Sequence, residues 1–189
     1  MIFRIDDVSL NTPVDRLTQM ITEIRARFAD ARILIAVSPI VFDMVEERGL
    51  SQERPFPAIL NAFSDPRVFY KGDRLGIPDF LGALETNYGV EIASHGLIHV
   101  DHRLLTKEAQ ELSILVSASI IGSRIFVPPF NKWNQDLKDV CESNQLELVV
   151  WEEGWEHLVY STEPFSQDGK YYFHTHDFEL GVFVERLER

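Results

Sequence analysis

The sequence predicts an α/β protein built on a mostly parallel sheet or barrel. Strand-like apolar runs alternate with helical patterns along the chain, which is typical of β-α-β units joined by right-handed crossovers. Residues 32–38 are almost continuously apolar, as in a strand that is buried on both faces. The chain has 189 residues, so we expect a single domain over residues 1–189 with a sizeable core.

The first part of the chain begins with a strand over residues 2–5 that runs into Asp6 and Asp7. A helix follows through about residue 28, with Thr12 as its cap and Pro13 at its first position. Its apolar side chains recur at helical spacing: Leu17, Met20, Ile21, Ile24 and Phe28. Between the buried strand and residue 78, the pattern predicts only a helix over residues 57–63 and a strand over 68–70.

The rest of the chain keeps the same alternation. Gly89 ends one helix, Thr106 caps another, and the pair Pro128-Pro129 stops a strand. The expected elements are helices over residues 77–87, 106–121, 133–144 and from about 178, and strands over 90–93, 125–127, 146–151 and 171–173.

Composition excludes several classes of partner. Eighteen basic against thirty acidic residues give a formal charge of −12, which disfavours nucleic acid and anionic membrane surfaces. The start has no basic segment followed by an apolar one, and the longest apolar stretch, residues 33–42, is too short to span a membrane. We therefore expect a cytoplasmic protein without membrane insertion. The single cysteine, Cys141, allows no internal disulfide and fits packing better than nucleophilic chemistry.

Residues 94–102 contain three of the six histidines and follow a predicted strand. His95 and His99 are four residues apart, so a helical turn would place both imidazoles on one face, where they suit one divalent metal ion. The alternative is a solvated or hydrogen-bonded pair. The small residues around them leave room for a ligand, which favours the metal site. His102 is a weaker candidate, which can equally cap a helix or face water.

Further polar groups also follow directly on predicted strands, and in a parallel sheet such ends lie on one rim. Asp6 and Asp7 point to opposite sides if their strand continues, so one can bind a metal while the other faces a substrate. The alternative is a turn or a helix cap. One aspartate with the histidine pair makes the three-ligand set of a catalytic zinc site, and the other is then the base. Of His174 and His176 we expect one to face this site, and His176, beside Asp177, suits a proton donor better.

At these residues the chain resembles the polysaccharide deacetylases of carbohydrate esterase family four, the NodB-homology domain. The family motif Thr/Ser-Phe-Asp-Asp is similar to Arg4-Ile5-Asp6-Asp7, and His-Ser/Thr-x-x-His is similar to His95-Gly96-Leu97-Ile98-His99. The motif Arg-Pro-Pro-Tyr is similar to Val127-Pro128-Pro129-Phe130, and the late Leu-x-His is similar to His174-Thr175-His176. The resemblance runs over residues 1–177 in the family's order. It implies a distorted (β/α) barrel with seven strands.

The resemblance also implies roles for single residues. Asp7, His95 and His99 would hold a divalent metal, with zinc expected first and cobalt, nickel, iron or manganese as alternatives. Asp6 would be the general base and His176 the general acid. The backbone amide of Phe130 would help to stabilise the oxyanion.

The chain departs from the family at two motifs. Val127 stands where the family has an arginine that orients the base, and Arg124 is the nearest possible substitute on that strand. The family's fourth motif, which contains Trp and Asp, is matched only weakly, by Trp151 and Trp155. We expect these tryptophans to contact the sugar together with His174. For at least one of these tryptophans, packing in the core or at the rim is the alternative.

The resulting hypothesis is a metal-dependent hydrolase that removes an acetyl group from the nitrogen of an amino sugar. We expect an intracellular substrate, such as a lipid-linked or nucleotide-linked precursor of a surface glycan. One alternative is a catalytically silent relative that binds a sugar or a partner protein in the same cleft. Another is a metallohydrolase of a different amide. The sequence leaves the oligomeric state open.

Overall fold

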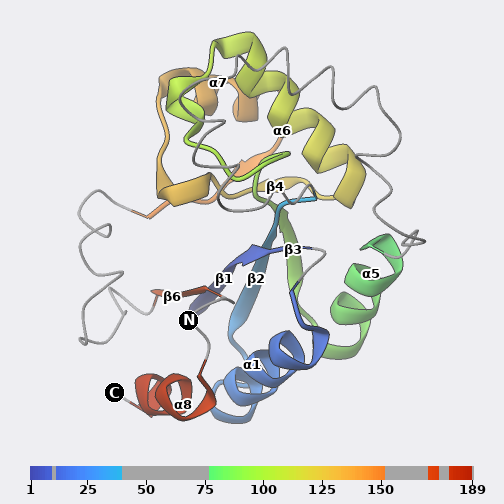
Figure 1. The fold of residues 1–189 in the computed structure, drawn as a ribbon, viewed down its shortest axis with the longest axis vertical. Coiled ribbons are helices and arrows are strands. Elements are labelled where there is room, and N and C mark those ends of the chain that lie inside the picture. Colours follow the sequence, from blue (N-terminus) through green and yellow to red (C-terminus); the bar gives the residue numbers. More distant parts are fainter. Residues whose placement is uncertain (10–11, 40–76, 152–169, 175–178, 189) are drawn as a thin grey trace.

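The computed structural model describes residues 1–9, 12–39, 77–151, 170–174 and 179–188. Six strands form one sheet in the order β5-β4-β3-β2-β1-β6, and every pairing in it is parallel (Figure 1). The strands are β1 (Ile2–Val8), β2 (Arg32–Val37), β3 (Glu91–Ser94), β4 (Ile125–Phe126), β5 (Glu147–Leu148) and β6 (Lys170–His174). The predicted parallel α/β class is confirmed. Six of the seven expected strands lie in the described part of the chain.

Five helices accompany this sheet in the described residues: α1 (Val14–Arg27), α5 (Ile77–Tyr88), α6 (Lys107–Ile121), α7 (Gln135–Ser143) and α8 (Leu180–Glu188). In Figure 1, α1 and α8 lie at the bottom of the view, α5 lies to the right of β3, and α6 and α7 lie at the top. Single turns of 3-10 helix occur at His102–Leu104 and Pro129–Asn131. No helix of the described part is long and apolar enough to cross a membrane.

The helices pack on one face of the sheet, which we call the outer face. There, Phe3, Ile35 and Ile92 belong to a core cluster with side chains of α1, α5 and α8. Phe126 of β4 packs with residues of α6 and α7, including Cys141. Burial raises the pKa of the Cys141 thiol to about 12, as expected for a packing residue rather than a nucleophile.

The opposite face, which we call the inner face, carries a smaller buried cluster and two charged side chains. The cluster contains Leu34, Ala36, Ala93, Val127, Val149 and Trp151. Arg4 pairs in register with Leu34, and both Arg4 and Asp6 are buried. Because side chains alternate along β1, Arg4 and Asp6 lie on this inner face, while Phe3 and Ile5 lie on the outer one.

Helix ends follow the sequence signals in one case and depart from them in another. Thr106 caps α6 as predicted, since its hydroxyl accepts a hydrogen bond from the amide of Ala109. The predicted cap of α1 is wrong by one residue. Thr12 Oγ1 instead accepts from the amide of Ser9, which closes the turn after β1, so Pro13 flanks the helix and the helix begins at Val14.

β4 and β5 are shorter than predicted, whereas β6 extends the predicted strand 171–173 by one residue at each end. β4 ends where Pro128 and Pro129 offer no amide hydrogen for pairing, and β5 pairs with β4 on one side only. Of the elements expected between residues 39 and 78, the helix over 57–63 and the strand over 68–70 lie outside the described residues.

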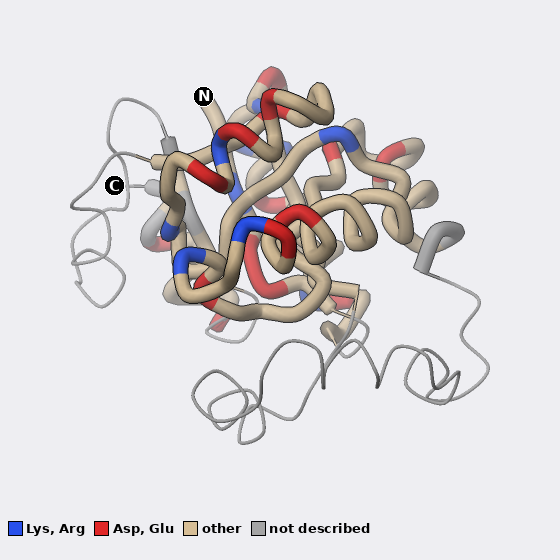
Figure 2. Tube along the Cα trace, turned by 90° about the horizontal axis from the view of Figure 1, so that it is seen from above, with Lys and Arg blue, Asp and Glu red and all other residues tan. Residues whose placement is uncertain are grey.

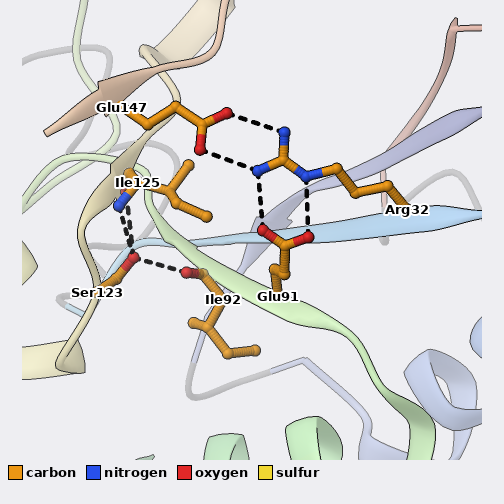
Figure 3. A network of polar contacts seen from close by, with 6 residues as sticks. All are labelled: Arg32, Glu91, Ile92, Ser123, Ile125 and Glu147. Atoms are coloured by element: carbon orange, nitrogen blue, oxygen red, sulfur yellow. Dashed lines mark hydrogen bonds and ion pairs between the residues drawn. The ribbon is translucent and has the colours of Figure 1, made fainter.

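At the amino ends of the strands, a polar network joins β2, β3 and β5 (Figure 3). The Arg32 guanidinium donates two hydrogen bonds to Glu91, at 2.9 and 2.8 Å, and two to Glu147, at 2.8 and 3.0 Å. The Ser123 hydroxyl donates to the carbonyl of Ile92 at 2.6 Å. This network holds the end of the sheet that lies opposite the candidate site. Elsewhere on the surface, acidic and basic positions are interspersed on the face drawn in Figure 2.

Candidate metal centre

The backbone of β1 changes conformation at its carboxyl end. Asp7 has φ of 58°, and the register with β2 shifts between Ile5 and Val8. Aspartate is among the few residues that adopt this left-handed conformation readily. Asp6 stays buried on the inner face, and Asp7 turns toward the histidines that follow β3. The two carboxylates thus separate as expected, but through an irregularity in the strand rather than through regular alternation.

Asp7 meets both histidines of the predicted pair. His99 Nε2 lies 2.9 Å from Asp7 Oδ1, and His95 Nε2 lies 3.4 Å from the same oxygen. One ligand atom from each of Asp7, His95 and His99 falls within 4.8 Å of the others. Two imidazoles and one carboxylate are a donor set suited to zinc and related divalent ions.

The His95 ring is oriented for a ligand by its second nitrogen. Nδ1 lies 2.8 Å from the carbonyl of Val127, so this nitrogen carries the hydrogen and donates it. Nε2 therefore keeps its lone pair, is buried, and makes no hydrogen bond to any described residue. A buried acceptor without a hydrogen bond, beside a carboxylate and a second imidazole, fits a bound cation.

The segment that carries the two histidines is a loop rather than the predicted helical turn. Gly96 has φ of +80°, and a Cβ on it would lie 2.6 Å from His102 Cε1. His102 neither caps a helix nor faces water. Its ring is buried, with Nδ1 3.0 Å from the carbonyl of Val100 and Nε2 3.0 Å from the Ser113 hydroxyl. The loop therefore folds around His102, which needs a glycine at position 96.

The surroundings of Asp7 act on its pKa in opposite directions. Burial alone would raise the pKa of the Asp7 carboxyl, but the neighbouring imidazoles of His95 and His99 hold that pKa well below its usual value. Asp7 is therefore ionised at neutral pH, as a metal ligand must be.

The last strand brings one of its two histidines to this centre. β6 pairs with β1 so that His174 lies beside Asp6, and His174 Nε2 is 3.5 Å from Asp7 Oδ2. His176 and its neighbour Asp177 lie outside the described residues. The expectation that only one of His174 and His176 faces the site therefore stays a prediction.

The Pro129–Asn131 turn forms one wall of the site. Phe130 and Asn131 have φ of 57° and 56°, an uncommon conformation for residues other than glycine. The Phe130 ring meets the His99 ring edge-on, with centroids 4.3 Å apart, and is 49% exposed. The turn therefore lies against one of the candidate ligands while keeping an aromatic surface open to solvent.

The two tryptophans of the weak fourth motif differ in outcome. Trp151 is 4% exposed and belongs to the inner-face cluster, so of the two expected roles it takes packing and not sugar stacking. Trp155 lies outside the described residues.

Sequence reasoning missed Arg4. It named only Arg124 as a possible cation for Asp6, but Arg124 is exposed, and its carbonyl accepts a hydrogen bond from the Glu147 amide at the amino end of the sheet. Arg4 is fully buried instead, and its Nη2 lies 3.0 Å from Asp6 Oδ2. The signal was present in the sequence, because an arginine inside an otherwise apolar buried strand needs a charged partner.

Comparison with solved structures supports the resemblance at the level of the fold. A family 4 carbohydrate esterase from Streptomyces lividans, solved with acetate, matches with a TM-score of 0.55 and 13% identity over 98% of this chain and 83% of that one. The peptidoglycan deacetylase PdaC from Bacillus subtilis, solved as a mutant, matches with a TM-score of 0.52 and 12% identity over 99% and 80%. A CE4 family pseudoenzyme from Bacillus anthracis matches with a TM-score of 0.58 and 10% identity, over all of this chain and 58% of that one.

No protein-family model matches the chain, and no curated protein matches it in sequence. The chain therefore has the fold of family 4 carbohydrate esterases, with a sequence that is far diverged from the solved members.

Replacing Asp7 tests the metal centre. Asp7→Asn keeps the size and the left-handed backbone but removes the charge, so we expect zinc affinity to fall by at least about 100-fold, since even changes beyond the ligands cost 10–100-fold. Titration calorimetry of metal-stripped protein measures this loss. Asp15→Asn, on the exposed first turn of α1, is the matched control and should bind zinc like the wild type. Equal affinity in both variants would contradict the assignment.

His102 should make folding sensitive to acid. Burial lowers the pKa of His102 from 6.5 to about 4, so between these values the unfolded chain binds a proton that the folded chain refuses. Stability is then lost as pH falls from about 6.5 toward 4, by up to about 3 kcal/mol from this group. Urea unfolding of metal-free protein at pH 7 and pH 4.5 measures the loss. His102→Gln, which retains a hydrogen-bonding side chain, should lose less stability over the same interval, and an identical loss would contradict the prediction.

Proposed function

We propose that the protein is a divalent-metal-dependent hydrolase that removes an acetyl group from the nitrogen of an amino sugar. The observation that carries this proposal is the meeting of Asp7, His95 and His99 beside a second, buried carboxylate at the carboxyl edge of a parallel sheet. The fold supports it, because the solved structures with this fold include a carbohydrate esterase and a peptidoglycan deacetylase. Zinc is the metal we expect first.

In the proposed mechanism, Asp7, His95 and His99 would hold the ion, which would act as a Lewis acid toward the water and the amide carbonyl. Asp6 takes the proton from the attacking water. Its Oδ2 lies 3.0 Å from Arg4 Nη2, and both carboxylate oxygens are buried without a hydrogen bond from the described residues, so we assign Oδ1, which is not in that ion pair, as the basic atom.

The products form when the carbon–nitrogen bond of the amide breaks. The Phe130 amide donates a hydrogen bond to the oxyanion of the tetrahedral adduct. A histidine then protonates the leaving nitrogen, so that the reaction yields acetate and a free amine. The resemblance favours His176 for this step, whereas the short distance from His174 to Asp7 favours a place for His174 at the metal centre.

Asp6→Asn tests the chemistry. Loss of the base should lower kcat by about 10²–10⁴-fold, and zinc content should stay near that of the wild type because Asp7 and the histidines are intact. Acetate release is measured on N-acetylated sugars that are nucleotide-linked, oligomeric or part of peptidoglycan, which also separates a precursor from a polymer as substrate. Asp136→Asn, an exposed carboxylate at the start of α7, is the control. Full activity in Asp6→Asn would contradict the assigned role.

His174→Ala and His176→Ala separate the two late histidines. We expect His174→Ala to weaken zinc binding, because its ring lies against a ligand carboxylate. His176→Ala should lower kcat with zinc retained. Zinc content by atomic emission and kcat on the best substrate distinguish the two patterns, and a reversed pattern would make His174 the acid.

A second function has its own support. Val127 stands where the family has an arginine, and one structural match is a CE4 family pseudoenzyme. A silent relative would bind an N-acetylated sugar without releasing acetate, and its binding would not change in Asp6→Asn. Calorimetric binding of the same sugar panel, measured beside turnover, decides between the two.

A further inference from the structure

Arg4 is a fully buried arginine in the middle of a strand, which calls for a physical explanation. Among the residues that the structure describes, no other lysine or arginine is buried. An aliphatic side chain at this position would pack beside Leu34 without desolvating a charge, and buried ion pairs seldom stabilise a fold better than such packing does. A charged residue at position 4 is therefore better explained by the groups that it positions than by a contribution to the stability of the fold.

The guanidinium makes three contacts. Nη2 forms an ion pair with Asp6 Oδ2 at 3.0 Å that lacks hydrogen-bond geometry, and Nη1 donates a hydrogen bond to Asn131 Oδ1 at 3.1 Å. The guanidinium also forms a cation–π contact with the Trp151 ring, with Cζ 4.9 Å from the ring centroid. The planar guanidinium thus contacts a carboxylate, an amide oxygen and an aromatic face at once, an arrangement that an ammonium group reproduces less well.

Asn131 extends this frame to the turn that lines the site. Its Oδ1 also accepts from the Trp151 amide at 2.9 Å, and its Nδ2 donates to the Trp151 carbonyl at 3.1 Å. Asn131 directly follows Phe130, and both hold a left-handed backbone. Arg4 therefore connects the carboxylate of Asp6 with the backbone that carries the Phe130 amide.

The residue that directly follows β4, Val127, lies in the same region and carries no charge. Val127 is fully buried in the apolar inner-face cluster that also contains Trp151. Its backbone carbonyl accepts the hydrogen bond from His95 Nδ1. A cation for Asp6 thus comes from the first strand and not from the segment after β4.

We propose that Arg4 is the positioning residue of this site, which holds the Asp6 carboxylate and the Pro129–Asn131 turn in one rigid frame. The inference rests on the proposed hydrolase function, in which Asp6 and the Phe130 amide act on the same substrate. Arg4 itself touches no reacting atom. The cation that orients the base has moved from residue 127 to residue 4, which explains how Val127 is compatible with activity.

The test uses zinc-loaded full-length protein and a relocated cation. Arg4→Met should lower kcat by about 100-fold or more while KM changes less than about threefold and zinc stoichiometry stays at that of the wild type. Arg4→Lys should recover only part of kcat, because the fork is lost. Arg4→Met combined with Val127→Arg should recover at least tenfold over Arg4→Met, because residue 127 and the Trp151 ring share one cluster.

Arg32→Met is the matched control. Arg32 is also a strand arginine with paired carboxylates (Figure 3), but it lies at the amino end of β2, opposite the candidate site. The Arg32→Met substitution should lower the melting temperature and leave kcat unchanged. If Arg4→Met behaves like Arg32→Met, or if kcat and zinc content fall together without recovery by Val127→Arg, the role of Arg4 is structural only.

A crystal structure gives a readout that needs no activity. In Arg4→Lys, which keeps the charge and so favours folding, and in Arg4→Met, we expect the Asp6 carboxylate and the 129–131 turn to shift from their wild-type places. Unchanged positions would overturn the proposal even if the wild type releases no acetate. Zinc-loaded wild type without turnover on any sugar would instead contradict the hydrolase function and leave the positional result standing.

Discussion

The left-handed backbone at Asp7 is the constraint on which the candidate site depends. A regular strand would carry Asp6 and Asp7 to opposite faces of the sheet, one of them toward the helices. The register shift between Ile5 and Val8 instead leaves Asp6 buried beside Arg4 and turns Asp7 toward the imidazoles in the loop that follows β3. Two adjacent acids thereby acquire different surroundings, one with a guanidinium and one with histidines. Different surroundings are what allow neighbouring carboxylates to take separate roles.

The site also concentrates features that do not favour stability. Removing one partner of a buried ion pair such as Arg4 and Asp6 typically costs about 3–5 kcal/mol, yet an apolar pair at the same positions is often at least as stable. Phe130, Asn131 and Asp7 hold uncommon backbone angles, each of which costs on the order of 1–3 kcal/mol. Strain and buried charge gathered at one edge of a sheet are typical of a functional site. The opposite edge, where Arg32 joins Glu91 and Glu147, has a more exposed and more conventional network.

Local pattern explains why most of the described elements could be predicted. Parallel strands joined by helices place all carboxyl ends on one rim, so Asp6, Asp7, His95 and the 128–130 segment could be placed together without knowing any contact. Boundaries were less predictable, because caps compete with turns. Thr12 is a residue type that favours the N-cap of a helix, but its hydroxyl accepts a hydrogen bond from the Ser9 amide instead. Trp151 is a residue type that often stacks on sugars, but here it is buried in the inner-face cluster and contacts Arg4.

The sequence by itself determined the parallel α/β class, the rim, and the candidate metal donors, because each depends on periodicity or on residues that follow a strand. Only the tertiary structure decided that Asn131 joins Arg4 to the turn and that the histidine loop folds around His102 without a helix. These contacts join residues whose separation in the chain reaches 127 positions. The physical reason is that a side chain's partner across a sheet is set by strand order and register, which no local pattern encodes.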